Sequence, residues 1–139
     1  MKKITAPLRV YAGSEALVHI REKGLQADSI SMLLGASSGP KWLVLHGIDQ
    51  WLMSSFFQNR RQLLHLLGTS AGAWRMAAFS QSDSLAAHLR FTEAYIEQCY
   101  SDKPSAQEVL STCRNVIRDL LGKKGAREIL SHPYARMHL

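Results

Sequence analysis

Residues 65–79, "HLLGTSAGAWRMAAF", decide how this sequence is interpreted. An apolar run ends at Gly68, small residues continue to Gly72, and a helical pattern begins behind them. The pattern Gly-x-Ser-x-Gly around Ser70 fits a strained turn between a strand and a helix, because its small flanking residues let neighbouring backbone approach. The serine hydroxyl then lies at the helix N-terminus, where free amides and the helix dipole favour an oxyanion. The stretch therefore predicts a nucleophile elbow at 68–72, with Ser70 as the nucleophile.

A second Gly-x-Ser-x-Gly run, "GASSG" at 35–39, also stands between a predicted strand and a predicted helix. Pro40 separates this run from its helix, whereas the residues after Ser70 all keep their amides and turn helical at once. We therefore interpret 35–39 as a companion loop that supplies oxyanion donors to Ser70. The expected donors are the amides of Ser38, Gly39 and Ala71.

Strands alternate with helices along the chain, which indicates an α/β fold with a parallel sheet. Strands are predicted at 29–35 and 61–68, with a short edge strand at 8–13 and the start of another strand at 134–139. Helices are predicted at 14–23, where Ser14 is the expected N-cap, and at 40–57, 71–81, 83–100, 105–121 and 123–131. The predicted strands are too few to form a sheet that matches this number of helices. We therefore expect 1–139 to be the N-terminal part of one larger domain.

The composition is that of an ordinary globular protein, with 46% hydrophobic and 20% charged residues in 139. The formal charge of +6 suits an anionic partner such as a phospholipid surface or nucleic acid, although solubility explains it equally well. No apolar stretch has the length of a signal peptide or a membrane span, so the expected location is the cytoplasm. Cys99 and Cys113 lie in helical patterns and are expected to be buried free thiols.

Two segments in this order carry a family resemblance: "GASSGPKWLVLHGIDQWL" at 35–52, and "GTSAGAWRMAAF" at 68–79 after a strand. Together with "EAYIEQCYSDKPS" at 93–105, they resemble bacterial patatin-like acyl hydrolases. The resemblance covers about Ser29 to Leu139. It implies a three-layer α/β/α fold and a serine–aspartate dyad that hydrolyses lipid ester bonds without a cofactor. Ser70 falls on the family's nucleophile, between the elbow glycines Gly68 and Gly72.

The chain departs from the family pattern in two places. The family's oxyanion loop, Gly-Gly-Gly-x-Arg/Lys-Gly, falls on 37–42, which overlaps the expected oxyanion loop 35–41; Gly39 and Lys41 match it, while two serines and Trp42 replace glycines. The family's aspartate lies downstream in an Asp-Gly-Gly/Ala motif, and no aspartate here precedes a glycine. The resemblance therefore assigns the base to a residue absent from this sequence, and implies that these 139 residues alone hydrolyse almost nothing.

Two other functions stay open at this point. One is a small esterase with its own triad, built in chain order from Ser70, Asp102 or Asp119, and His132 or His138. The other is a non-catalytic basic module that binds a lipid surface or nucleic acid. The sequence has no helix-turn-helix, RNP or zinc pattern, no phosphate-binding glycine motif and no metal-ligand spacing. We therefore expect a lipid or acyl-ester substrate, and no nucleic acid, cofactor or metal.

Several other residues have an ordinary structural interpretation beside a functional one. His65 is five residues before Ser70, and we interpret it as a core histidine rather than a base. Trp51 is expected in the core, whereas Trp74 is placed to line the site. Phe56 and Phe57, ahead of the basic "NRR" at 59–61, fit either contact with an anionic membrane or core packing followed by a solvated loop. We favour the core interpretation.

Overall fold

Three parallel strands form the centre of the structure, in the order β1–β2–β3. They are β1 (Met32–Gly35), β2 (Leu64–Gly68) and β3 (Ala135–His138). The computed structural model describes residues 9–139. The register places Gly35 beside Gly68, and Leu67 beside His138. The predicted α/β fold with a parallel sheet is therefore confirmed.

The helices follow the predicted pattern closely. They are α1 (Ser14–Lys23), η1 (Ala27–Ser29), η2 (Gly39–Leu45), α2 (His46–Trp51), η3 (Leu52–Phe56), α3 (Ala71–Phe79), α4 (Ser84–Ile96), α5 (Ala106–Leu121) and α6 (Gly125–Leu130). The helix predicted at 40–57 is a 3-10 turn, an α-helix and a π-helical turn in succession. No helix in residues 9–139 combines the length and the apolarity needed to cross a bilayer.

Two predictions near the start of the described chain are wrong. The predicted edge strand at 8–13 does not form over residues 9–13, and Leu8 lies outside the described residues. Val10 and Tyr11 are exposed there, and no strand lies beside them to pair with. The N-cap of α1 is Gly13 rather than Ser14, which is the first helical residue.

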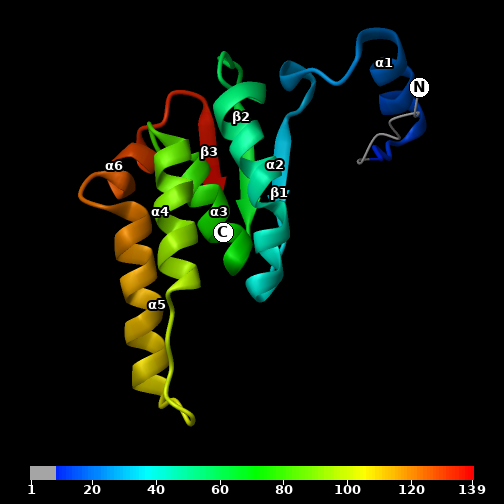
Figure 1. Cartoon of the computed structure of the whole chain (residues 1–139). Coiled ribbons are helices and arrows are strands. Elements are labelled where there is room, and N and C mark those ends of the chain that lie inside the picture. Colours follow the sequence, from blue (N-terminus) through cyan, green and yellow to red (C-terminus); the bar gives the residue numbers. More distant parts are fainter. Residues whose placement is uncertain (1–8) are drawn as a thin grey trace, which may run out of the picture.

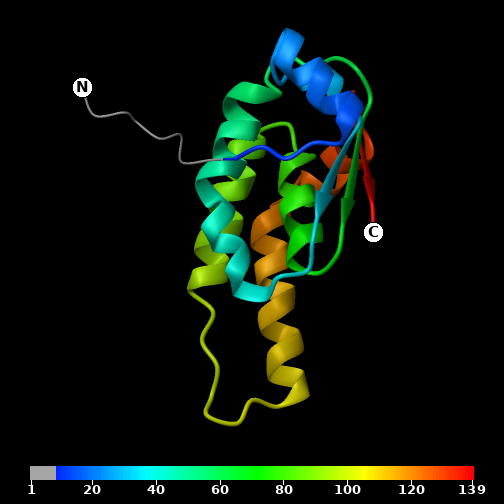
Figure 2. The same cartoon turned by 90° about the vertical axis from the view of Figure 1, so that its right-hand side faces the viewer.

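Helices cover one face of the sheet in the described structure. Figure 2 shows α2, α3, α4 and α5 on the same side of the three strands. On that side Leu64, Leu66 and Ala135 are buried, whereas on the other side Leu34 is 70% exposed and Met32 and Leu67 are also exposed. The described residues therefore form two layers rather than the three that the family resemblance implies. Parallel sheets are normally buried on both faces, so this apolar face is unusual.

Aromatic rings form the core between the sheet and the helices. The Trp42 ring is fully buried and stacks on Phe91 of α4, with 4.5 Å between ring centroids. Trp51 is 49% exposed, so its expected place in the core is wrong. The buried side of that helical segment is taken by Asp49, Met53 and Phe57, which recur every four residues and leave Trp51 facing outward.

The burial expected of both cysteines is also wrong. Cys99 is exposed because it follows the end of α4, in the loop before α5, and Cys113 is partly exposed on α5. Both thiols are free, as expected.

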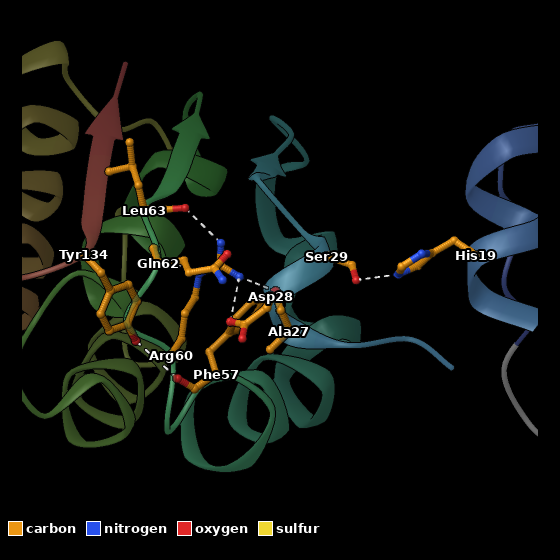
Figure 3. Close-up of polar contacts among 9 residues, drawn as sticks. All are labelled: His19, Ala27, Asp28, Ser29, Phe57, Arg60, Gln62, Leu63 and Tyr134. Atoms are coloured by element: carbon orange, nitrogen blue, oxygen red, sulfur yellow. Dashed lines mark hydrogen bonds and ion pairs between the residues drawn. The ribbon is translucent and has the colours of Figure 1, made fainter. Parts of the chain in front are cut away.

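Arg60 forms hydrogen bonds where β2 begins (Figure 3). This is the end of the sheet opposite Ser70, which follows β2. The Arg60 guanidinium donates to the carbonyl oxygens of Gln62 (2.9 Å), Leu63 (2.8 Å) and Ala27. Phe57 is buried, as the core interpretation requires, so it offers no surface to a membrane. Arg60 itself is buried, however, so the expectation of a wholly solvated "NRR" loop is wrong. The guanidinium N–H groups of Arg60 thus provide hydrogen-bond donors for the backbone carbonyls where β2 begins.

Three glycines let α3 press against the sheet directly behind the predicted elbow. A Cβ atom on Gly72 would lie 1.9 Å from the carbonyl oxygen of Gly35, and one on Gly68 would lie 2.5 Å from the Cα of Ala73. The Thr69 amide donates to the same Gly35 oxygen at 3.0 Å. The start of α3, the end of β1 and the end of β2 are therefore in backbone contact.

This contact predicts opposite effects for two glycine substitutions. Gly72→Ala places a methyl group against rigid backbone, and we expect it to lower the free energy of unfolding by about 2–3 kcal/mol or more. Gly47→Ala in α2 meets no atom within 4 Å, so better helix propensity should raise the free energy of unfolding by about 0.5–1 kcal/mol. Urea unfolding of both variants measures the difference. Equal effects would contradict the close approach.

Candidate acyl-transfer site

Ser70 has a backbone conformation that other non-glycine residues of the described chain avoid. Its φ of 54° and ψ of −129° make it the only non-glycine residue with positive φ among residues 9–139. Such a conformation costs about 1–3 kcal/mol and persists only where the surroundings enforce it. Here the Ser70 carbonyl accepts from the Ala73 amide at 2.9 Å, and Gly68 and Gly72 on either side are held by backbone contacts.

The Ser70 hydroxyl is not used as a helix cap. Ser70 occupies the N-cap position of the nine-residue α3, yet its side chain accepts no hydrogen bond from the amides of that helix. An ordinary N-cap serine has extended backbone and bonds the second or third amide, as Ser105 does at the start of α5. Ser70 is exposed, and its hydroxyl is thus not engaged by the helix behind it.

Some backbone amides after Ser70 and in the companion loop form no backbone hydrogen bond in the described chain. The first amides of α3 after Ala71 are used within the turn, since Gly72 donates to Thr69 and Ala73 to Ser70. Within the described chain, the Ala71 amide has no acceptor, and neither do the amides of Ser38 and Gly39. Gly39 has a φ of +51°, with open space around its missing side chain, so the loop's conformation rather than crowding requires glycine there.

The structure brings the two predicted loops together. The loops that follow β1 and β2 lie side by side at the carboxyl end of the sheet in both views (Figures 1 and 2). The Thr69–Gly35 hydrogen bond joins them directly. Lys41 is exposed, and no described carboxylate lies within 4.0 Å of its ammonium group. Trp42, which stands where the family has a glycine, instead anchors this segment in the core.

The histidines considered as bases lie elsewhere. Nδ1 of His65 and Nε2 of His138 are 2.9 Å apart and bonded to each other on the uncovered face of the sheet. The expectation that His65 is a core residue is therefore wrong, because the strand alternation turns Leu64 and Leu66 inward and His65 outward. His132 accepts from the Ala135 amide at 2.9 Å, before β3 begins and thus at the other end of the sheet from Ser70.

The aspartates of the in-chain triad do not reach Ser70 either. Asp102 is exposed in the loop between α4 and α5. Asp119 is exposed on α5, with its carboxylate 3.9 Å from Arg118. In residues 9–139, no hydrogen bond joins the Ser70 side chain to any histidine or aspartate. The structure therefore joins the Ser70 turn to the 35–39 loop through the Thr69–Gly35 hydrogen bond, but it does not join Ser70 to these partners.

A buried ion pair, which the sequence patterns described above do not predict, lies behind the two loops. Arg75 of α3 donates from Nε and Nη2 to the two carboxylate oxygens of Asp49 on α2, each at 2.6 Å. Both side chains are buried, with 2% of Asp49 and 8% of Arg75 exposed. A signal was present: each is the only acidic or basic residue in its helix, leaving histidine aside. The sequence pattern of either helix does not show which residue in the other helix is its partner.

A histidine cluster lies next to this ion pair. Nε2 of His88 lies 3.0 Å from Nδ1 of His46, whose Nε2 lies 2.5 Å from Gln50 Nε2. Burial lowers the pKa of His88 from 6.5 to about 4, and the nearby Asp49 carboxylate offsets only part of that effect. His88 is thus neutral at neutral pH. Among residues 9–139, no three His, Cys, Asp or Glu side chains form a metal-binding group.

A hollow away from Ser70 does not suit an acyl chain. It measures about 520 Å³ and lies between α4 and α5. Charged side chains line most of it: Arg90, Glu93, Glu97, Arg118, Asp119 and Lys123.

Trp74, expected to line the site, is half-buried in the structure. Its ring packs edge-on against Phe91 and Tyr95, with ring centroids 5.7 and 6.1 Å away.

The buried neutral His88 predicts a loss of stability in acid. The unfolded chain takes up a proton as the pH falls through 6.5, whereas folded His88 takes it up only near pH 4, so the free energy of unfolding falls between these values. His132, whose pKa is also lowered by burial, adds in the same direction. Between pH 7.5 and pH 5, we expect the free energy of unfolding of His88→Gln to fall by about 2 kcal/mol less than that of the parent. Urea unfolding at both values measures this, and an NMR titration placing His88 near 6.5 would contradict it.

Comparison with known proteins adds no relative from which function could be transferred. No family model, no curated protein and no solved structure matches this chain. The family resemblance described above rests on the residues at 35–52, 68–79 and 93–105. The proposal below is based on that resemblance and on the geometry of the two loops.

Proposed function

We propose that this protein is a patatin-like serine acyl hydrolase that acts on lipid ester bonds, with Ser70 as the nucleophile. One observation carries the proposal: the Ser70 backbone is strained, its hydroxyl caps no amide of α3, and the amide of the next residue, Ala71, has no backbone acceptor in the described chain. Strain of this kind is maintained where a reacting group must be presented. The three-layer patatin fold belongs to the same proposal, in which the uncovered sheet face receives further helices.

In the proposed reaction, the Ser70 oxygen attacks the ester carbonyl carbon and transfers its proton to a carboxylate base. The carbonyl oxygen becomes an oxyanion, held by the Ala71 amide and by the amides of Ser38 and Gly39. The alcohol leaves with a proton, and water then releases the acid from the acyl-enzyme. Loss of one such donor typically costs about 2.7–4 kcal/mol of transition-state stabilisation. Lys41, exposed beside this loop, is proposed to contact the substrate.

We propose that the base is an aspartate outside these 139 residues. Asp49 is held by Arg75, and the other described aspartates form no hydrogen bond with Ser70. The two free thiols fit a reducing compartment, and we therefore place the reaction in the cytoplasm. The net charge of +6 fits contact with anionic lipid at the membrane surface.

The first test concerns the base. We expect the 139-residue chain to hydrolyse p-nitrophenyl butyrate at almost the same rate as its Ser70→Ala variant, because a serine without a base retains only the help of binding and oxyanion donors. Initial rates of ester hydrolysis measure this. Fast hydrolysis that disappears in Ser70→Ala would place the base inside the chain and contradict the proposed dyad.

The second test concerns the environment of the nucleophile and needs no base. Ser70→Cys in a Cys99→Ser/Cys113→Ser background carries one thiol, and we expect its pKa to lie at least one unit below the ordinary 8.5, because free amides and the α3 N-terminus stabilise the thiolate. The rate of iodoacetamide alkylation against pH measures it. Ser131→Cys, at the C-terminal end of α6, is the matched control and should show no lowering. Equal pKa values at both positions would contradict the proposed function.

A further inference from the structure

The buried Asp49–Arg75 pair contributes more to geometry than to stability. Removing two charges from water costs several kcal/mol per ion, and buried ion pairs are often replaced by apolar residues of similar volume without loss of stability. Arg75 lies in a helix that is otherwise apolar, where a methionine or leucine would pack readily. Apolar residues do not supply directional bonds, whereas the two 2.6 Å hydrogen bonds from Arg75 to Asp49 form a planar fork with a defined geometry.

The pair joins the two segments that carry the free amides. Arg75 lies four residues, about one helical turn, after Ala71, so both are on the same side of α3. Asp49 lies in α2, which continues directly from η2, and η2 begins at Gly39. The ion pair therefore connects the helix behind Ser70 to the helix behind the companion loop.

A second contact lies nearer the loops. The close approach of Gly72 to the Gly35 carbonyl holds the start of α3 against the end of β1. The ion pair joins α3, about one helical turn further along, to α2, which lies on the other side of the companion loop from β1. The helix behind Ser70 is thus attached to the chain both before and after that loop.

Neighbouring charges do not disturb the pair. His88 lies close enough to interact with both partners, and burial lowers its pKa to about 4, so it carries no charge at neutral pH. The other described ion pairs, Arg60 with Asp28 and Arg118 with Asp119, lie elsewhere in the fold. At neutral pH the guanidinium of Arg75 is thus committed to Asp49.

We propose that Asp49 and Arg75 are positioning residues of the Ser70 site: their ion pair sets the angle between η2–α2 and α3, so that the amides of Gly39 and Ala71 point at one oxyanion. This inference rests on the proposed acyl-transfer function. It assigns a role to two residues that touch neither the substrate nor Ser70.

The test uses variants that leave the net charge unchanged, all in the single-thiol Ser70→Cys background. Arg75→Lys keeps the charge but loses the planar fork, and Asp49→Leu/Arg75→Met replaces the pair with apolar groups of similar size. Any change in the thiol pKa then reports geometry rather than removal of a charge. Arg60→Lys, at the opposite end of β2, is the matched control because Arg60 is also a buried arginine, but its hydrogen bonds go to backbone carbonyls far from Ser70.

We expect Asp49→Leu/Arg75→Met to keep most of its free energy of unfolding while the thiol at position 70 becomes about tenfold less acidic. Arg75→Lys should move the thiol pKa in the same direction, and Arg60→Lys should lower stability without moving it. Iodoacetamide alkylation against pH and urea unfolding give the two readouts. If the pair variants change stability alone, the positioning role is wrong while the proposed function stands. If the Ser70→Cys parent already has an ordinary thiol pKa, both are wrong.

Discussion

Much of this structure depends on how closely two backbones approach at the carboxyl end of the sheet. The Gly35 carbonyl accepts the Thr69 amide and also touches Gly72, so the end of β1 fixes both the turn after β2 and the first residues of α3. Any side chain at Gly72 would push the helix away and release the turn. Because the strands are parallel and adjacent, their following loops emerge at the same edge, which is where α/β proteins commonly place their ligands. Glycine at these positions is therefore a condition for the whole site.

The strain at Ser70 is supported by packing further from the surface. Trp42 holds the companion segment in the core through its stack on Phe91, and the Asp49–Arg75 pair ties the helix that follows to α3. These contacts are buried and rigid, whereas the serine they support is exposed. Buried support of this kind is what the proposed acyl transfer requires of Ser70, because preorganised donors must already face the oxyanion when it forms.

Local patterns in the sequence predict most of the elements and the two loops. Apolar runs that end in glycine predict β1 and β2, and the spacing of apolar residues predicts the helices from α3 to α6. Apart from the edge strand at 8–13 and the N-cap of α1, several of the errors concern which way a side chain faces. His65 and Trp51 both belong to apolar segments, but strand alternation and the buried row Asp49, Met53 and Phe57 turn them outward. The ion pair of Asp49 with Arg75 joins residues far apart in the sequence, so no local pattern identifies it.

The order of the strands has a consequence for how the chain acquires its structure. β2, which leads into Ser70, is the middle strand, yet its two neighbours differ greatly in sequence distance: β1 closely precedes it, whereas β3 lies at the end of the chain, beyond four helices. Pairing of distant segments is slow because a long loop must close first. We therefore expect the two loops and the glycine contact to form before β3 pairs with the far edge of β2. In that order of events the Ser70 turn forms early, and docking of β3 is the late step.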